Sequence, residues 1–260
     1  MLFGPPKDVP TSIFATLPPE FRIAAVGNEW VRGQPGACPA RSLLEGPSFD
    51  KDGNLWCVDI PNGQVFRISP GGDFTLVAEY DGWPNGLKFH KDGRIFIADY
   101  KNGIMEMDPV TGVVRPFLVR ANLERFKAVN DLFFAANGDL YFTDQGLTGL
   151  HDPTGRVFRV TPDGRVTCLL GNVPSPNGVV MNLDETILYV AVTRGNCVWR
   201  LPIYAGWHHR KGRSVCATFG GLRRPGRAGP GRAGAASDRA CRHGLGLDCR
   251  PTRRAGVSRT

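Results

Sequence analysis

A fourfold repeat is the strongest constraint on the fold of this chain. Four segments can be aligned with one another, and each opens on a polar residue that we call the anchor of its repeat. Successive anchors are 40, 45 and 47 residues apart, and they are Glu45, Asn85, Asn130 and Asn177. Repetition at a period of 20 to 50 residues is typical of proteins that assemble one supersecondary unit several times.

Each repeat has the same internal order of apolar runs and turns. An apolar run follows the anchor, a turn pair such as Asp52-Gly53 comes seven residues after it, and a second apolar run ends 14 residues after it. Dipeptides of this kind supply the backbone of tight hairpin turns. A third run follows, and often a fourth. The predicted second and third strands are Leu55–Asp59 and Gln64–Ile68, Ile95–Asp99 and Gly103–Met107, Leu140–Asp144 and Arg156–Val160, and Ile187–Ala191 and Cys197–Leu201.

This order predicts an all-β fold in which every repeat is a four-stranded antiparallel meander. Short strands, turns rich in Gly and Pro, and this period indicate a β-propeller with one repeat per blade. We expect residues 45–222 to form the blades. Residues 1–44 are expected to be an N-terminal extension that packs on the propeller or lends it a strand. Residues 223–260 form a tail rich in Arg, Gly and Ala, for which we expect disorder.

The four anchors are candidate site residues because the first strand of each blade lines the channel of a propeller. Equivalent positions then meet at one mouth of that channel. One carboxylate, from Glu45, with the amide oxygens of Asn85, Asn130 and Asn177 suits a hard divalent cation such as Ca²⁺. The alternative is that Asn-Gly and Asn-Asp only mark turns and that Glu45 is a surface charge.

Three segments carry a resemblance to a known family. They are Leu-Glu-Gly-Pro-Ser-Phe-Asp at 44–50, Val-Asn-Asp at 129–131 with Tyr-Phe-Thr-Asp at 141–144, and Ser-Pro-Asn-Gly at 175–178. With these motifs in this order, the chain resembles the SMP-30/gluconolactonase family over roughly residues 12–222. The resemblance implies a six-bladed propeller that holds one divalent metal at the channel mouth and hydrolyses a sugar lactone or a similar ester.

The resemblance also implies roles for single residues. Glu45 and Asn177 match metal ligands, and Asn130 matches a residue that binds either metal or substrate. Ca²⁺ is the expected ion, with Zn²⁺ or Mg²⁺ as alternatives. We expect Asn85 and Lys127 to join Asn130 in contacting the lactone. An Arg often found two residues before the substrate Asn is Ala128 here, which puts gluconolactone itself in doubt. The fourth ligand, and a candidate base, is an Asp in a Pro-Asp-Gly-Leu motif one blade later.

That motif is absent where the period would place it, near residue 225. The chain has a net charge of +8, and residues 223–260 carry all of it, with ten Arg and two Asp; the rest holds 22 basic and 22 acidic residues. If the codons of residues 224–234 are translated from their second base, with synonymous bases left free, they can encode Gly-Pro-Asp-Gly-Leu-Ala-x-Asp-x-x-Gly. We therefore hypothesise a frameshift near 222–224. The catalytic residue is then unknown, and activity of the chain as written would be weak or absent.

Other readings remain open. The tail could instead be an Arg/Gly-rich RNA-binding segment, although it lacks aromatic residues and any regular repeat. The blades could form a propeller without catalysis that binds a small molecule or a protein at its mouth. The sequence shows neither a signal peptide nor an apolar stretch of membrane-spanning length. We expect a cytoplasmic lactonase with a small-molecule substrate and neither nucleic acid nor membrane as a partner.

Overall fold

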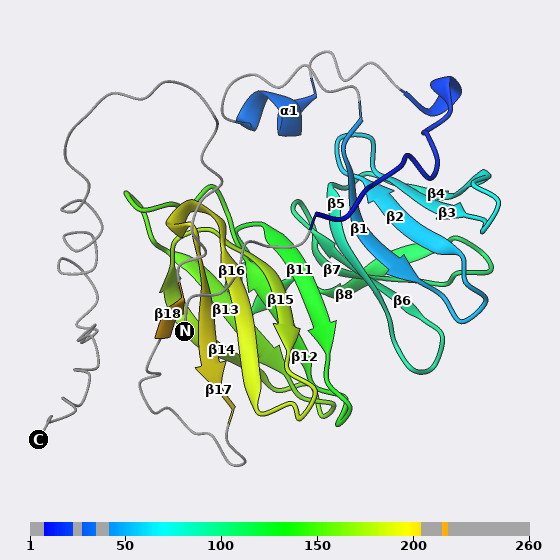
Figure 1. The fold of residues 1–260 in the computed structure, drawn as a ribbon. Helices are drawn as coiled ribbons and strands as arrows, with labels where there is room; N and C mark the ends of the chain where they lie inside the picture. The colour runs from blue at the N-terminus through cyan, green and yellow to red at the C-terminus, as the bar shows by residue number, and fades with distance from the viewer. Residues whose placement is uncertain (1–7, 23–27, 35–41, 204–214, 218–260) are drawn as a thin grey trace, which may run out of the picture.

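The computed structural model describes residues 8–22, 28–34, 42–203 and 215–217, and within them four four-stranded antiparallel sheets follow one another in chain order (Figure 1). In every sheet the strand order equals the sequence order. The sheets are β1 (Leu44–Phe49), β2 (Leu55–Asp59), β3 (Gln64–Ile68) and β4 (Phe74–Glu79); β5 (Pro84–Phe89), β6 (Ile95–Asp99), β7 (Gly103–Met107) and β8 (Val114–Leu118); β11 (Val129–Phe134), β12 (Leu140–Asp144), β13 (Gly155–Val160) and β14 (Val166–Val173); and β15 (Pro176–Met181), β16 (Ile187–Val192), β17 (Cys197–Pro202) and β18 (Val215–Ala217).

These sheets are the blades of a propeller, as the repeat predicts. The first strands of consecutive blades contact one another, β1 with β5, β5 with β11, and β11 with β15. Figure 1 shows β11 and β15 side by side and running in the same direction. The all-β fold and the four blades of the sequence-based prediction are therefore confirmed. We number the blades one to four in chain order.

The core of the molecule lies between the blades. Successive residues of a strand point to opposite faces of its sheet. In β6, Phe96 packs in the cluster shared with blade three, whereas Ile97 packs in the cluster shared with blade one. A third cluster joins Tyr141 and Val157 of blade three to Leu188 of blade four. Both faces of a middle strand are thus buried, which explains why these strands are continuous apolar runs in the sequence.

The turn pairs act as predicted, and their backbone geometry explains the residues found there. Gly53, Gly93 and Gly138 adopt φ values of +82°, +93° and +87° in the first hairpin of their blades. Only residues without a Cβ adopt this region without cost. The fourth blade has Glu185 at this position with φ +53°. Its carboxylate accepts a hydrogen bond from the backbone N–H of Ala136 at 2.8 Å, so the strained turn also links two blades.

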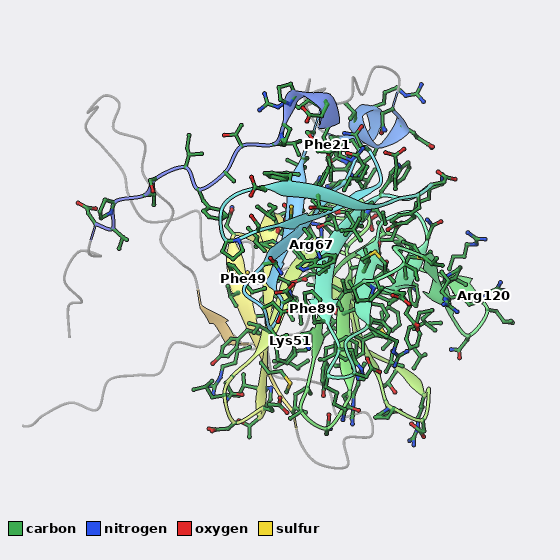
Figure 2. The ribbon with its side chains drawn as sticks, turned by 90° about the vertical axis from the view of Figure 1, so that its right-hand side faces the viewer. Phe21, Phe49, Lys51, Arg67, Phe89 and Arg120 are labelled. Carbon is green, nitrogen blue, oxygen red and sulfur yellow. The ribbon has the colours of Figure 1, made fainter. Side chains whose placement is uncertain are left out.

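Residues that precede the first blade contact its outer face. Leu17 is buried in a cluster with Cys57, Phe66 and Ile68, and the ring of Phe21 lies 5.1 Å from that of Phe66. Phe21 ends a short 3-10 helix, η1 (Pro19–Phe21), which is seen at the top of Figure 2. A helical turn, α1 (Glu29–Gly33), begins where the side chain of Asn28 accepts the backbone N–H of Trp30 at 2.9 Å.

A short hairpin completes the described fold. A hairpin of β9 (Arg120–Ala121) and β10 (Glu124–Arg125) connects blades two and three, and Arg120 projects from it in Figure 2. No helix among the described residues has the length and apolar character needed to cross a membrane. The frameshift hypothesis and the tail at 223–260 lie outside the described residues.

Candidate functional site

The four anchors occupy equivalent positions in the structure, and each one lies at a break in strand pairing. The register between first and second strands shifts between Glu45 and Ser48, between Pro84 and Gly86, between Val129 and Leu132, and between Pro176 and Val179. Such bulges re-aim a side chain away from the ordinary alternation of a strand. All four first strands therefore present their anchor from the same kind of irregular backbone.

Glycine follows three of the anchors, and at two of them, Gly46 and Gly86, neighbouring blades approach one another too closely for a Cβ. A Cβ on Gly46 would stand 2.5 Å from the carbonyl oxygen of Asn85, and one on Gly86 would stand 2.9 Å from that of Asn130. Real Cβ atoms do not approach a backbone oxygen to 2.5 Å. Gly46 and Gly86 are therefore more than turn signals, since they let successive first strands come into contact at the anchors.

The anchors Glu45 and Asn177 have side-chain oxygen atoms that accept no hydrogen bond from the described residues. Glu45 is exposed, and its carboxylate forms no hydrogen bond or ion pair with the described residues. Asn177 is half-buried, and its backbone carbonyl accepts a hydrogen bond from Thr143 Oγ1 at 2.7 Å. That bond fixes the main chain of Asn177 against blade three and leaves its carboxamide without a partner in the described part of the chain.

Asn130 and Asn85 are buried, with exposed fractions of 4% and 8%. Asn130 Nδ2 donates hydrogen bonds to Tyr100 Oη at 3.0 Å and to Gln145 Oε1 at 2.9 Å. The hydroxyl of Tyr100 also donates to Gln145 Oε1, so the three side chains close a ring of hydrogen bonds. With both amide protons used, the Oδ1 of Asn130 is turned away from this ring.

Tyr100 and Gln145 were not among the predicted site residues. Each comes directly after the Asp that ends the second strand, which places both 15 residues after their own anchor. This shared distance from the anchor is visible in the alignment of the repeats and could have identified both residues. Burial raises the pKa of Tyr100 to about 12; the hydrogen bond from Asn130 and the charge of Arg194 oppose the increase, and the charge of Glu45 adds to it. The phenol therefore stays protonated at neutral pH.

The aspartates that recur at the ends of second strands are turn caps. Asp99 accepts backbone N–H groups from Trp83 at 3.0 Å, Lys101 at 2.7 Å and Asn102 at 2.8 Å. Asp144 accepts those of Lys127 at 2.7 Å and Ala128 at 2.9 Å. These bonds hold the segment that enters the first strand of the same blade, and they occupy the carboxylates structurally.

Lys127 lies at the edge of this region. Its side chain is exposed, and its Nζ donates to Thr154 Oγ1 at 2.5 Å in the loop between β12 and β13. Further along the first strands, Lys88 Nζ lies 3.4 Å from Ser48 Oγ and 4.0 Å from Asp131 Oδ1. This second polar group joins blades one, two and three and was not predicted.

The donor set at the anchors fits a hard divalent cation. Among the described residues no group of three or more His, Cys, Asp or Glu side chains could hold a metal. A cation at this level would therefore depend on one carboxylate and neutral amide oxygens, which Ca²⁺ accepts. Glu45, Asn130 and Asn177 each have a side-chain oxygen that accepts no hydrogen bond from the described part of the chain. Their role as ligands stays a prediction.

Comparison with known proteins places the chain in a family. Residues 43–226 match the SMP-30/gluconolactonase/LRE-like region, which covers all four blades. The chain belongs to the SMP-30/gluconolactonase/LRE-like family. Within this family, it is 33% identical over 170 residues to a gluconolactonase of Zymomonas mobilis, in an alignment that covers 56% of this chain and 48% of the relative. It is 31% identical over 169 residues to the lactonase drp35 of Staphylococcus aureus, covering 62% and 51%.

Solved structures resemble this SMP-30/gluconolactonase/LRE-like chain in fold. A gluconolactonase of Xanthomonas campestris superposes with a TM-score of 0.58 and 23% identity, covering 66% of this chain and 62% of the other. A calcium-binding regucalcin of Agrobacterium tumefaciens superposes with a TM-score of 0.53 and 25% identity, covering 62% and 54%. The chain spans about half the length of the curated relatives it matches.

Proposed function

We propose that this chain carries part of a metal-dependent lactonase site, formed by the anchors at the propeller mouth. The observation that carries the proposal is the row of four bulged anchors on first strands that contact one another. The names of its relatives in the family, a gluconolactonase and a lactonase, support lactone hydrolysis as the reaction class.

Glu45, Asn130 and Asn177 would hold the cation. A divalent ion bound there supplies a Lewis acid that polarises the lactone carbonyl and lowers the pKa of water. Glu45 contributes the only carboxylate of the set, so it supplies most of the electrostatic attraction. Asn130 and Asn177 contribute neutral oxygens from neighbouring blades. We propose Ca²⁺ as the ion, with Zn²⁺ and Mg²⁺ as alternatives; the printed name of the Agrobacterium structure supports calcium.

Asn85, Asn130 and Lys127 would bind the lactone. A sugar lactone presents several hydroxyl groups, and amide side chains can donate to and accept from hydroxyls at the same time. Lys127 adds an ammonium group at the edge of the mouth, where it can leave Thr154 for a substrate oxygen. We propose these contacts as the determinants of orientation, and a small-molecule lactone as the substrate.

The general base is the missing part of this site. The aspartate that the family resemblance implies would fall near residue 225, outside the described residues. We propose that a one-base shift in the reading frame removed it. Sequencing of the coding DNA across codons 215–235 tests this hypothesis, and a frame that restores Pro-Asp-Gly is the expected result. An intact present frame, found again with the same tail in related genes, would refute it.

Cation binding and lactone hydrolysis test the proposal together. We expect isothermal titration of the chain with CaCl₂ to show one site, which Glu45→Gln weakens and Glu20→Gln leaves unchanged. Glu20 is a matched control, because it is an exposed glutamate far from the anchors in sequence. Hydrolysis of a panel of lactones is measured by the fall in pH, once with the chain as written and once with the reading frame corrected. Cation binding without acidification in either protein would favour a propeller that only binds ligands.

A further inference from the structure

Three blades contribute to the hydrogen-bond network around the Asn130 carboxamide. Tyr100 comes from blade two, Asn130 and Gln145 come from blade three, and Ser175 precedes the first strand of blade four. Gln145 Nε2 donates to Ser175 Oγ at 2.8 Å. Gln145 and Ser175 have exposed fractions of 8% and 2%, so their polar atoms have little access to water as an alternative partner.

A carboxamide in such a network can be oriented in two ways. In the observed orientation, Asn130 Nδ2 donates to Tyr100 and Gln145, and Oδ1 is directed away from both. In the reversed orientation, Oδ1 would accept from Tyr100 and Gln145, and the two N–H groups would be directed away instead. A cation accepts an oxygen ligand and repels N–H donors, so only the observed orientation makes Asn130 a possible ligand.

The local backbone holds Gln145 in place. Ser175 has a left-handed φ of +60° between Pro174 and Pro176, a conformation that costs energy for a residue other than glycine. Its N–H donates to Thr148 Oγ1 at 3.0 Å, and Thr148 Oγ1 donates to the carbonyl of Gln145 at 2.5 Å. This strained and buried segment keeps Ser175 Oγ within reach of Gln145 Nε2 and so directs Gln145 Oε1 toward Asn130.

We infer that Tyr100 and Gln145 are positioning residues that hold the Asn130 carboxamide with its oxygen toward the cation. The inference rests on the proposed function, because it assigns these residues a role through a proposed ligand. Two residues at the same position of adjacent repeats then determine that Oδ1 of Asn130, and not Nδ2, is directed toward the cation. Neither residue is proposed as a ligand.

Three variants separate this role from simple stability. Tyr100→Phe removes both the acceptor for Asn130 Nδ2 and a donor to Gln145. Gln145→Met removes the acceptor at similar volume. Gln145→Glu can only accept at its carboxylate oxygens, so it preserves the observed orientation. Tyr80→Phe is the matched control, since Tyr80 donates to Asp99 at 2.8 Å and is also a largely buried tyrosine, whereas Asp99 keeps three backbone donors without it.

The first measurement is Ca²⁺ affinity by isothermal titration of the full chain. Loss of a residue that orients a ligand typically lowers affinity about 10- to 100-fold. We expect about a tenfold loss for Tyr100→Phe and Gln145→Met, and wild-type or tighter binding for Gln145→Glu and Tyr80→Phe. Equal affinity of wild type, Tyr100→Phe and Gln145→Met would overturn the inference.

The second measurement needs no cation. In protein labelled with ¹⁵N-asparagine, the Asn130 side-chain signals are assigned by their loss in Asn130→Asp. We expect both protons to exchange slowly with water in wild type and faster in Tyr100→Phe. Rapid exchange in a wild-type chain that binds Ca²⁺ would overturn this inference alone. A wild-type chain that binds no Ca²⁺, Zn²⁺ or Mg²⁺ would overturn the proposed function together with the role of Tyr100 and Gln145 that depends on it.

Discussion

Arg156 and Asp144, the residue directly before Gln145, form a buried ion pair with Arg156 Nη2 2.6 Å from Asp144 Oδ2. The Asp144 side chain has no exposed surface, and that of Arg156 is 10% exposed. The same carboxylate accepts the backbone N–H groups of Lys127 and Ala128, and Arg156 also pairs with Glu124 at 2.8 Å. This pair therefore fixes the segment that leads from the β9–β10 hairpin to Asn130.

Asp144→Asn is expected to destabilise the fold strongly. Removal of one partner from a buried ion pair leaves the other charge uncompensated, which costs about 3–5 kcal/mol. The free energy of unfolding from urea denaturation measures the loss. Asp163→Asn is the control, because Asp163 and Arg165 form a pair whose side chains are 63% and 64% exposed. Similar losses in the two variants would contradict a structural role for Asp144.

Gly86→Ala tests the close approach of neighbouring blades. The added Cβ would stand 2.8 Å from Asp131 Oδ1 and 2.9 Å from the carbonyl oxygen of Asn130, so the strands must move apart. Overpacking of this kind costs about 1–3 kcal/mol. Gly171→Ala should be nearly neutral, since its Cβ would meet no atom within 4 Å and its φ is not left-handed. Denaturation midpoints of both variants give the comparison. An unchanged midpoint for Gly86→Ala would show that the first strands of blades two and three are not closely packed at Gly86.

Leu17→Ala tests whether the residues before the first blade stabilise it. Leu17 is 7% exposed and packs with Phe66, so its truncation should cost about 2–5 kcal/mol. Ile13 is 85% exposed, and Ile13→Ala should change the free energy of unfolding by less than about 0.5 kcal/mol. Whether residues 1–44 act as an extension of the propeller stays a prediction that this pair of variants decides.

Stability should fall at alkaline pH partly because of Cys57. Burial, and to a lesser degree the charge of Asp59, raises its pKa from 9.0 to about 12. Below pH 9 both folded and unfolded states keep the thiol proton, and the contribution to stability is complete. Between pH 9 and 12 the unfolded chain releases its proton first, so stability decreases as the pH rises. Urea midpoints at about pH 8 and about pH 9.5, below the usual tyrosine pKa, should differ less in Cys57→Ala than in wild type.

Thiol labelling provides an independent check on Cys57. Its protonated and buried thiol should react with iodoacetamide only when the blade opens, so peptide mapping of folded protein at neutral pH should find it unmodified. Cys168 is exposed and should be modified before Cys57, although desolvation raises its pKa as well. Modification of both residues at one rate would mean that the core of blade one is accessible to solvent.

The periodic part of the fold could be predicted from the sequence almost residue by residue. Leu55–Asp59 and Gln64–Ile68 were predicted as strands, and β2 and β3 have these bounds. The runs are bounded by Gly-containing turns whose geometry is local, so strand ends follow from short-range chemistry. The β9–β10 hairpin was not predicted, because Arg120–Arg125 has no counterpart in the other repeats.

The candidate site was only partly predictable for a related reason. Anchors such as Asn130 stand out because each opens an apolar run. Tyr100 and Gln145 differ in residue type, so they share no pattern beyond their distance from the anchor. The role proposed for both depends on contacts across blades, and these contacts join residues that are 30 and 45 positions apart in the chain. A single sequence contains that register but does not say which positions meet.

Because blades contact in sequence, the chemistry of an anchor is set by two repeats rather than one. Asn130 is held by position 15 of its own repeat, Gln145, and by position 15 of the preceding repeat, Tyr100. By the same geometry Asn85 would lie between Ile60 and Tyr100, with one apolar neighbour. A substitution in one blade can therefore change the hydrogen bonds of the anchor in the next blade without altering that anchor or its strand, so identical asparagines are held differently around the propeller.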